Sequence, residues 1–337
     1  MPVRRGTGLL PAGWANRPGP RNDGDRHRRI RAESRGRPVT AGLGVRAMAE
    51  GPKLTIGVPV FNGATYLEAA VESILGQSFD DFELIISDNA STDDTEAIGR
   101  RLAARDRRVA YRRNATNVGL SANFNLLVGL ARGPLFKWAA ADDALLPGYL
   151  ARCVEHLDAE PDVVLVYAKT AFIDGSGAPL DIEDPGWHLV ADDPSVRLAF
   201  AITAGHFVNT MLGIIRTDAL RRTRLLPRYH GGDYRLMAEL ALLGKLLELP
   251  EALLVRRIHA SSSKGNAEDS SWMRRYWGGT RSGPPAAYWR LQRDLAGIVL
   301  SAPIPPGRRV ALLGRLARTM VTNRSRLVRE LGELVRG

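Results

Sequence analysis

Short apolar runs alternate with amphipathic stretches between residues 53 and 170. Residues 53–61 are rich in β-branched side chains and end at Asn62-Gly63, a pattern that predicts a buried strand followed by a turn. Apolar residues then recur three and four positions apart from Leu67 to Leu75, which predicts a helix that Thr65 can cap.

This alternation predicts the fold class. Further apolar runs predict strands at 82–87, 108–112, 135–139 and 163–167. The stretches between them predict helices that begin at Asp93-Asp94 and cover 120–131 and 148–158. Strands and helices in this order predict an α/β fold with a Rossmann-like, mostly parallel central sheet flanked by helices.

Several of the predicted strands end in polar residues. Asn62, Asp88 and the pair Asp142-Asp143 each follow the C-terminal end of a strand. Ligands of parallel α/β sheets bind beyond the carboxyl ends of the strands, which share one edge. We therefore expect these side chains to converge on a single site.

The second half of the chain has a weaker pattern. Residues 174–194 are typical of a loop, and helices predicted over 195–203 and 233–245 flank a strand over 211–215. The segment 308–336 predicts a helical C-terminal extension with apolar residues roughly on one face. These are Leu313, Leu316, Val321, Leu327, Leu331 and Leu334.

The net charge of +11 is concentrated at the N-terminus. Residues 1–47 carry eleven Arg against three acids, a net of +8, which leaves +3 for the other 290 residues. This Arg-, Gly- and Pro-rich segment predicts disorder over 1–49, because it has too few apolar residues to bury. A translation start at Met48 and a basic arm for nucleic acid or anionic lipid are the alternatives, and no nucleic-acid partner is expected.

Targeting and redox signals are sparse. The sequence has no secretory h-region and no run of 18 apolar residues, so we expect a cytoplasmic protein. Its single cysteine, Cys153, fits a reducing compartment and is interpreted as a buried helix residue.

Several catalytic classes lack their motif here. The turn after the first strand is Phe61-Asn62-Gly63-Ala64-Thr65, without the Gly-x-Gly-x-x-Gly of dinucleotide-binding domains. The sequence also lacks a phosphate-binding Gly-Lys-Ser/Thr loop and a Gly-x-Ser-x-Gly elbow. Carboxylates and amides remain, which suit a nucleotide base and a metal-bound diphosphate.

At this point the chain resembles family 2 glycosyltransferases, closely over residues 53–170 and more loosely over 205–265. The segments that carry the resemblance are Val58-Pro-Val-Phe-Asn-Gly63, Tyr66-Leu67, Ser73-Ile74-x-x-Gln77-Ser78, Ser87-Asp-Asn-Ala-Ser-Thr-Asp-Asp-Thr95, Asn117-x-Gly119, Asn123 and Ala140-Ala-Asp-Asp-Ala-Leu-Leu-Pro147.

The resemblance implies a GT-A fold, a nucleotide-diphospho-sugar donor and a divalent metal, Mg²⁺ or Mn²⁺. It implies that Asp88 accepts a hydrogen bond from the base; a turn or helix-capping role is the alternative. The other residues that it implies for nucleotide-sugar binding are Pro59, Phe61, Asn62, Asn89, Asn117, Asn123, Asp142 and Arg257.

The metal site departs from the family pattern at one position. Asp142 and Asp143 match the last two acids of an Asp-x-Asp-Asp stretch whose first acid is replaced by Ala140. The resemblance implies metal ligands at Asp142, Asp143 and His259, with Asp142 the principal one. Helix capping by the two acids, and a hydrogen-bonded structural histidine, are the alternatives.

The implied chemistry is a single displacement with inversion. Asp233, in His230-Gly-Gly-Asp233, matches the family's catalytic base, although it also suits a helix N-cap. Arg257 would neutralise the leaving diphosphate.

The expected protein is therefore an inverting, metal-dependent glycosyltransferase of cell-surface polysaccharide or glycolipid synthesis, acting on a saccharide or lipid-linked acceptor. A catalytically silent nucleotide-sugar-binding protein is the alternative that Ala140 leaves open. The expected parts are a glycosyltransferase domain over 50–265, with a nucleotide-sugar half (53–170) and an acceptor half (171–265), and a helical extension over 266–337. The arginines of 308–336 either contact the inner face of the membrane or form a solvated helix face.

Overall fold

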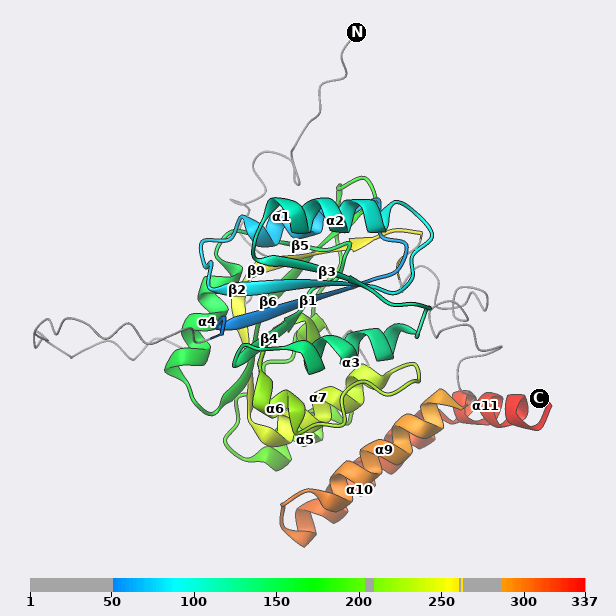
Figure 1. Cartoon of the computed structure of the whole chain (residues 1–337). Helices are drawn as coiled ribbons and strands as arrows, with labels where there is room; N and C mark the ends of the chain where they lie inside the picture. The colour runs from blue at the N-terminus through cyan, green and yellow to red at the C-terminus, as the bar shows by residue number, and fades with distance from the viewer. Residues whose placement is uncertain (1–50, 204–208, 261, 263–285, 337) are drawn as a thin grey trace, which may run out of the picture. The chain divides into compact units, whose positions relative to one another are not determined.

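The computed structural model describes residues 51–203, 209–260, 262 and 286–336, and the predicted disorder of 1–49 lies outside them. Strands and helices alternate as the sequence predicts in the first half (Figure 1). The elements are β1 (Leu54–Val60), α1 (Leu67–Leu75), β2 (Phe82–Asp88), α2 (Thr95–Arg105), β3 (Val109–Arg113), α3 (Leu120–Leu130), β4 (Leu135–Trp138), β5 (Ala144–Leu145), α4 (Tyr149–Ala159), β6 (Val163–Asp174), β7 (Pro179–Leu180), α5 (Pro194–Ala201), the 3₁₀ helix η2 (Asn209–Leu212), β8 (Ile214–Arg216), α6 (Thr217–Arg221), α7 (Gly232–Leu243), β9 (Lys245–Ile258), α9 (Ala287–Ser301), α10 (Pro306–Thr322) and α11 (Arg324–Arg336).

The strands form one mixed sheet in the order β3-β2-β1-β4-β8-β6-β9-β5, with β7 paired to β6. β1 to β4 run parallel to one another, and β6 and β9 are parallel to each other. β8 lies antiparallel between β4 and β6, and β5 is antiparallel to β9. The sheet is therefore mostly parallel, as predicted, with antiparallel strands that join its two parallel parts.

The first half of the sheet is covered on both faces. All seven residues of β1 are buried, as a strand between two helical layers requires. Figure 1 shows α1 and α2 on one side of the strands and α3 on the other. A Cβ at Gly57 would lie 3.0 Å from the Leu127 side chain, so this glycine allows α3 to pack closely on β1.

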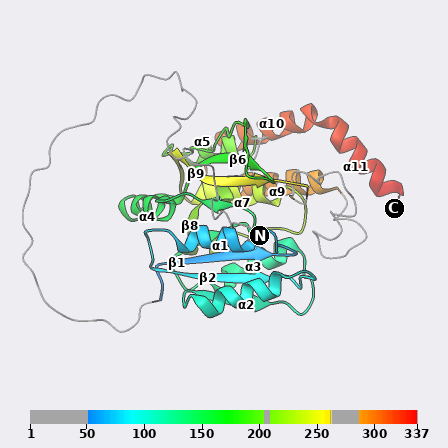
Figure 2. The same cartoon turned by 90° about the horizontal axis from the view of Figure 1, so that it is seen from above.

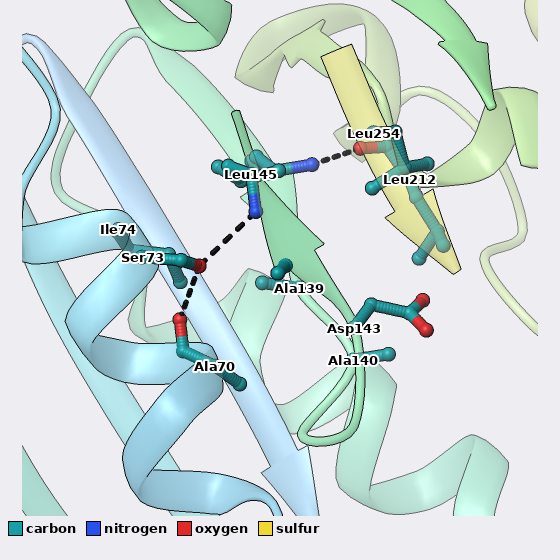
Figure 3. Close-up of a pocket in the computed structure, with 11 residues that line it drawn as sticks. Ala70, Ser73, Ile74, Ala139, Ala140, Asp143, Leu145, Leu212 and Leu254 are labelled. Carbon is teal, nitrogen blue, oxygen red and sulfur yellow. Dashed lines mark hydrogen bonds between the residues drawn. The ribbon is translucent and has the colours of Figure 1, made fainter. Parts of the chain in front are cut away.

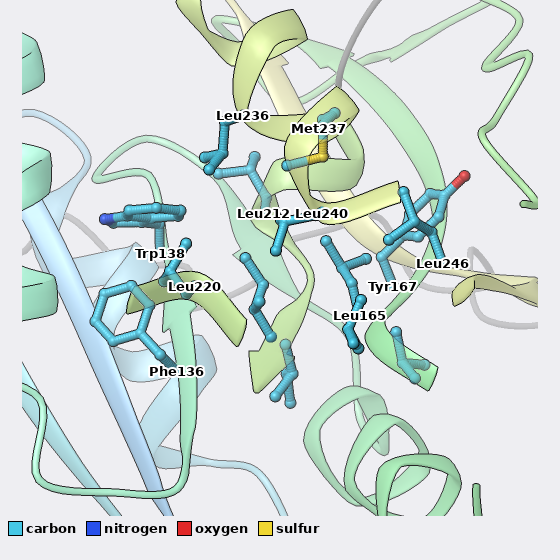
Figure 4. Close-up of a cluster of buried hydrophobic side chains, with 14 of the residues drawn as sticks. Phe136, Trp138, Leu165, Tyr167, Leu212, Leu220, Leu236, Met237, Leu240 and Leu246 are labelled. Carbon is cyan, nitrogen blue, oxygen red and sulfur yellow. The ribbon is translucent and has the colours of Figure 1, made fainter. Parts of the chain in front are cut away.

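A second hydrophobic layer forms under β4, β6 and β9, where α6 and α7 pack (Figure 4). Trp138 is fully buried, and its indole N–H donates to the Phe124 carbonyl at 3.0 Å. The remaining labelled side chains of this layer are Phe136, Leu165, Tyr167, Leu212, Leu220, Leu236, Met237, Leu240 and Leu246. Cys153 is fully buried in α4, as predicted, and burial raises the pKa of its thiol to about 12.

Several sequence-based boundaries are wrong in the second half. β6 continues to Asp174, seven residues beyond the predicted strand, and the 174–194 loop contains β7. The sequence pattern does not predict the 14-residue strand β9, because Pro250 and Glu251 interrupt it. In the structure the register of β9 against β6 shifts and leaves these two residues without ladder partners. The predicted strand over 211–215 is η2 followed by the shorter β8.

Two predicted details of the helices are also wrong. α1 begins after Tyr66 without a side-chain cap, so Thr65 does not cap it. The C-terminal pattern is divided into α10 and α11 at Asn323. Among its described side chains, Leu312, Leu316 and Leu327 are the buried leucines, and the predicted Leu334 lies outside the described side chains. Val321 and Leu331, placed on the apolar face by the sequence, are exposed. None of the helices in the described part of the chain is long and apolar enough to cross a membrane.

The buried Gln77 side chain connects α1 to α4 and predicts a stability effect. Its amide N–H group donates to the carbonyls of Ser73 (3.1 Å) and Leu146 (3.0 Å), and its oxygen accepts from the Leu150 N–H (3.3 Å) in the first turn of α4. We expect Gln77→Leu to lower the free energy of unfolding by about 2 kcal/mol, because it leaves buried backbone groups unpaired. Urea denaturation measures this.

The exposed neighbour Ser78 provides the control. Ser78→Ala should change the free energy of unfolding by less than about 0.5 kcal/mol. Equal stability of the Gln77→Leu and wild-type proteins would contradict the role given to this amide.

Candidate functional site

Pro59 marks the place where the sheet opens at the end of β1. The β1–β4 ladder ends at the pair Gly57–Trp138, after which the Ala139 N–H donates to the Gly57 carbonyl at 2.9 Å. The Gly57 carbonyl faces β4, and backbone groups two residues apart on a strand point to the same side. The Pro59 nitrogen therefore also faces that side of β1, where the pairing with β4 has ended. A proline, which has no N–H group, fits there without loss of a ladder bond.

The loop after β1 is held against the loop after β2 by Asn62. Phe61 is half-buried and Asn62 is exposed, with a left-handed backbone (φ 53°) that asparagine tolerates. The Asn62 N–H donates to Ser91 Oγ (2.9 Å), and its side-chain oxygen accepts from the Thr92 N–H (2.8 Å). Both loops therefore move as one unit.

Asp88, at the end of β2, is fully buried and makes several hydrogen bonds within the protein. One carboxylate oxygen accepts from the Ser91 N–H (2.8 Å), and the other accepts from Tyr111 Oη (2.6 Å) and the Arg113 guanidinium (2.8 Å). Burial acts to raise the pKa of Asp88, but these hydrogen bonds outweigh it and lower the pKa below its usual value. These contacts support a role for Asp88 as the buried group that holds the half-exposed Arg113 side chain in place.

Four asparagines form a buried amide network behind this edge. Asn89 donates to Asn117 Oδ1 (2.8 Å) and accepts from Asn114 (3.0 Å) and the Val118 N–H (3.0 Å). Asn123, on α3, accepts from Ser87 Oγ (2.7 Å) and donates to the Ser87 carbonyl (2.8 Å). The network joins β2, the loop after β3 and α3. Asn89 and Asn123 therefore support the carboxyl edge of the sheet from the protein interior.

The Asp142-Asp143 loop lies against the end of β9. β5, directly after the two acids, pairs with β9 through Ala144–Val255 and Leu145–Leu254. One Asp143 oxygen accepts from the Arg257 N–H at 3.0 Å, and one Asp142 oxygen lies 3.0 Å from His259 Nε2. The structure thus brings Asp142, Asp143, Arg257 and His259 together, although 114 or more residues of chain separate the acids from their partners.

Tyr66 is a member of this cluster that the sequence analysis did not single out. The guanidinium of Arg257 lies over its ring at 4.7 Å, and the His259 ring lies 4.8 Å from it. Its hydroxyl donates to the Gly175 carbonyl at 3.3 Å. Tyr66 immediately precedes α1, so it joins the β1 side of the site to the ends of β6 and β9. The Tyr66-Leu67 motif is the feature of the sequence that could have identified this residue.

The loops after β1, β2 and β4 form one rim. The Asn89 N–H donates to the Val60 carbonyl at 2.8 Å, which joins the first two loops. A Cβ at Gly63 would lie 3.7 Å from Ala141, which joins the first loop to the Asp142-Asp143 loop. Parallel pairing of β1 with β2 and β4 is the reason, because it places three carboxyl ends at one edge.

A small cavity lies beneath Asp143 (Figure 3). Its volume of about 10 Å³ is enough for about one water molecule and far too small for a nucleotide sugar. Lys137 lines it, is fully buried, and approaches the Leu212 carbonyl and the Tyr149 ring. Burial lowers the pKa of Lys137 to about 8.

Asp233 lies in the first turn of α7, after Gly231, whose left-handed backbone (φ 85°) forms the N-cap. Burial raises the pKa of Asp233 above its usual value, against the opposing effects of the Tyr234 N–H, His230 and Arg256. Arg256 acts electrostatically on both Asp233 and Asp143. The sequence analysis assigned Arg256 no role of its own, and its charge acts to lower the pKa of both carboxyls.

The donor groups at Asp142 and His259 fit a divalent cation. A half-exposed carboxylate and an imidazole nitrogen are suitable ligands for Mn²⁺, and carboxylate oxygen also suits Mg²⁺. Burial, followed by the negative charge of Asp142, raises the pKa of Asp143 well above its usual range, so positive charge would be stabilised there. Within the described residues no cluster of three acidic, His or Cys side chains forms a complete metal cage, and Ala140 supplies no ligand.

Comparisons with known sequences assign the family. Residues 55–216 match the sequence model described as Glycosyl transferase family 2. An uncharacterized glycosyltransferase of Haemophilus influenzae is 25% identical over 224 residues, which are 63% of this chain and 67% of the relative. The GalNAc(5)-diNAcBac-PP-undecaprenol beta-1,3-glucosyltransferase of Campylobacter jejuni is 37% identical over 105 residues, 31% of this chain and 34% of that relative. The chain therefore spans only about a third of the second relative's length.

Solved structures confirm the predicted GT-A fold. S. aureus TarS 1–349 in complex with UDP-GlcNAc has a TM-score of 0.63 at 16% identity, over 80% of this chain and 73% of that chain. The mannosyltransferase PcManGT from Pyrobaculum calidifontis, in complex with GDP-Man and Mn²⁺, has a TM-score of 0.51 at 19% identity, over 82% and 76%. The family match, the order of the motifs and the fold agree, and residues 55–216 form a glycosyl transferase family 2 domain.

Proposed function

We propose that this protein is an inverting glycosyltransferase that moves a sugar from a nucleotide-diphospho-sugar to a hydroxyl group. The observation that carries the proposal is the cluster of Asp142, Asp143, Arg257 and His259 at the edge where β1 and β2 also end. Within a family 2 chain, acids, a guanidinium and an imidazole at this edge suit a sugar diphosphate better than any other ligand.

The rim formed by the loops after β1, β2 and β4 is the proposed binding site of the sugar donor. TarS was solved with UDP-GlcNAc and PcManGT with GDP-Man, which supports a nucleotide-diphospho-sugar for this chain and leaves uridine and guanosine as the bases to test. We assign the nucleotide to the loop of Pro59, Phe61 and Asn62, whose half-buried aromatic ring and exposed amide suit a base and a ribose. Asp88, Asn89, Asn117 and Asn123 are assigned to the same site.

For the buried members of that set, the contacts support an indirect role. Asp88 holds Arg113 at 2.8 Å, and Arg113 also donates to the Ser91 carbonyl at 2.9 Å beside the nucleotide loop. The asparagine network fixes the loop after β2, and the Asn89 N–H donates to the Val60 carbonyl just before the nucleotide loop. A site held this way needs little rearrangement when the donor binds.

Asp142 and His259 would hold Mg²⁺ or Mn²⁺, with Asp143 beside them. When bound, such an ion neutralises the negative charge that develops on a departing diphosphate. Arg257 supports the same charge, because its guanidinium lies over Tyr66 and donates to the carbonyls of Asp142 (3.3 Å) and Asp174 (3.2 Å). These contacts fix the guanidinium beside the acid loop.

Asp233 is assigned as the general base. As the acceptor oxygen attacks the anomeric carbon and the bond to the nucleoside diphosphate breaks, a carboxylate must take the hydroxyl proton. A half-buried carboxylate with a raised pKa retains affinity for that proton, which suits the role. Attack on the face opposite the leaving group inverts the anomeric configuration.

The acceptor is proposed to be a saccharide or a lipid-linked saccharide of cell-surface polysaccharide or glycolipid synthesis. The C. jejuni relative is named for an undecaprenol-diphosphate-linked substrate, which supports this class. A silent nucleotide-sugar-binding protein, suggested by Ala140, would bind the donor and release no nucleoside diphosphate with any acceptor.

The metal assignment predicts a donor-binding defect. Thermal shift should show stabilisation by UDP- or GDP-sugars in the presence of Mn²⁺ or Mg²⁺, because ligand binding to the folded state raises its stability by mass action. We expect Asp142→Asn and His259→Ala each to weaken metal-dependent donor binding by about 10- to 100-fold. Asp218→Asn, an exposed carboxylate on α6, is the control and should bind like the wild type. Donor binding that is unchanged by EDTA and by both variants would refute the assignment.

The base assignment predicts a catalytic defect without a binding defect. Asp233→Asn should lower kcat by about 10²- to 10⁴-fold, since the amide cannot accept the proton. Calorimetry should give the same affinity for the donor as in the wild type. Near-normal transfer by this variant would mean that another group is the base.

The raised pKa of Asp233 predicts the acidic limb of the pH profile. The carboxylate must be deprotonated to act, so activity falls as the pH decreases through its pKa, which lies above the usual value of 3.8. We expect kcat/KM for the acceptor to decline at a higher pH than an ordinary aspartate would give. A rate that stays constant down to the usual aspartate range would contradict this assignment.

A further inference from the structure

The outer face of α10 exposes several apolar residues, and α11 exposes Val328 as well. Val310, Val321 and Val328 are 70%, 63% and 67% exposed. The exposed Gly314 and Ala317 lie between Val310 and Val321 at spacings of 4, 3 and 4 residues, which places these four residues on one side of α10, and Val328 lies on α11. We call these five residues the apolar line.

α10 and α11 are separated by a single turn residue, Asn323. The Asn323 N–H donates to the Thr319 carbonyl (3.1 Å), and the Asn323 carbonyl accepts from the N–H groups of Arg326 (3.1 Å) and Leu327 (3.3 Å). These hydrogen bonds keep the two helices joined by a tight turn, and Figures 1 and 2 show α11 running in a different direction from α10.

The opposite face of the same helices is packed, so the apolar line is not a core face left open. Leu312, Leu316 and Leu327 are buried, and α9 contacts both helices. Glu330 is buried too and accepts from the Tyr288 and Trp289 N–H groups at the start of α9. The helices are thus fixed on α9 with the apolar line directed away from the packing.

Arginines border the apolar line on one flank. Arg315 and Arg318 lie about a quarter to a third of a turn from it, and Arg329 has the same position on α11. Within the part of the chain whose side chains are described, no carboxylate lies within 4.0 Å of these three guanidinium groups. Among the side chains that the structure describes, Arg315 and Arg318 on α10 therefore carry positive charge without a paired carboxylate.

A cleft accompanies the arginines. Its volume is about 470 Å³, and Arg315, Arg318 and the hydroxyl-bearing Thr203, Thr319 and Thr322 line it with Asn323. Guanidinium groups and hydroxyls are donors that suit phosphate oxygens. The apolar line and the basic cleft thus occupy neighbouring parts of one helix surface.

We propose that the outer face of α10 and α11 binds an anionic phospholipid bilayer. The valines enter the boundary between headgroups and acyl chains, and Arg315, Arg318 and Arg329 contact headgroup phosphates. A nucleic acid would satisfy the arginines but leave the apolar line in water, and an apolar protein surface would leave the arginines unpaired. The bilayer interface is the partner that matches both features, and the inference does not depend on the transferase activity.

Vesicle sedimentation of the full chain tests this. Vesicles of phosphatidylcholine alone should leave the protein in solution, and vesicles containing phosphatidylglycerol should sediment it. Salt should weaken the binding, because it screens the attraction between the arginines and the lipid. Arg315→Ala with Arg318→Ala should weaken it by about 30-fold, which corresponds to about 1 kcal/mol per arginine.

A charge-matched pair separates this face from general basicity. Arg100→Ala with Arg101→Ala on α2 removes the same charge and should bind vesicles like the wild type. Val310→Ser with Val321→Ser keeps the charge and should weaken binding by about tenfold, since less apolar surface enters the bilayer. Donor binding should be unchanged in all three variants.

Three results would overturn the proposal. The first is a wild-type protein that does not sediment with phosphatidylglycerol. The second is equal binding by the α10 arginine variant, which would assign the binding to another basic segment such as residues 1–47. The third is a wild-type dimer that the valine variant converts to a monomer without any vesicle binding, which would make a second copy of the chain the occupant of this face.

Discussion

The pairing of β5 with β9 is the contact on which the candidate site depends. β5 is only two residues long, yet it directly follows Asp142-Asp143, and its partner strand ends at Arg257 and Ile258. So short a strand is not stable alone, and α1 supports it: Ser73 Oγ accepts from the Leu145 N–H at 3.1 Å, and Gln77 bonds the Leu146 carbonyl. The acid loop is thus fixed from both sides.

Buried polar groups give the other side of the rim its rigidity. Asp88 bonds Ser91, Tyr111 and Arg113, and the asparagine network continues from Asn89 to Asn123. Satisfied polar networks in a low-dielectric interior specify one arrangement, because any displacement leaves a buried donor or acceptor unpaired. The loops that follow β1 and β2 are therefore preorganised, a property that a binding site for a flexible diphosphate needs.

The sequence pattern and the structure diverge where long-range contacts decide the outcome. β9 contains Pro250 and Glu251, which oppose a strand in isolation, and a register shift against β6 leaves both without ladder partners. The family resemblance assigns Asp88 and Asn123 to nucleotide-sugar binding, and the fold adds that both side chains are buried. Val321 and Leu331 fit an apolar periodicity, but α9 covers a different face of the helix. Local pattern does not specify which face a neighbour covers.

The sequence alone determined the alternation of strands and helices, the parallel edge and the residue types at that edge, because period and strand-end position are local properties. The family followed from motifs that each span a few residues. Only the tertiary structure decided which polar groups face outward, that Tyr66 joins Arg257 to His259, and that Arg256 acts on both Asp143 and Asp233. These relations join residues far apart in the chain, and burial and pairing are fixed only when the sheet closes.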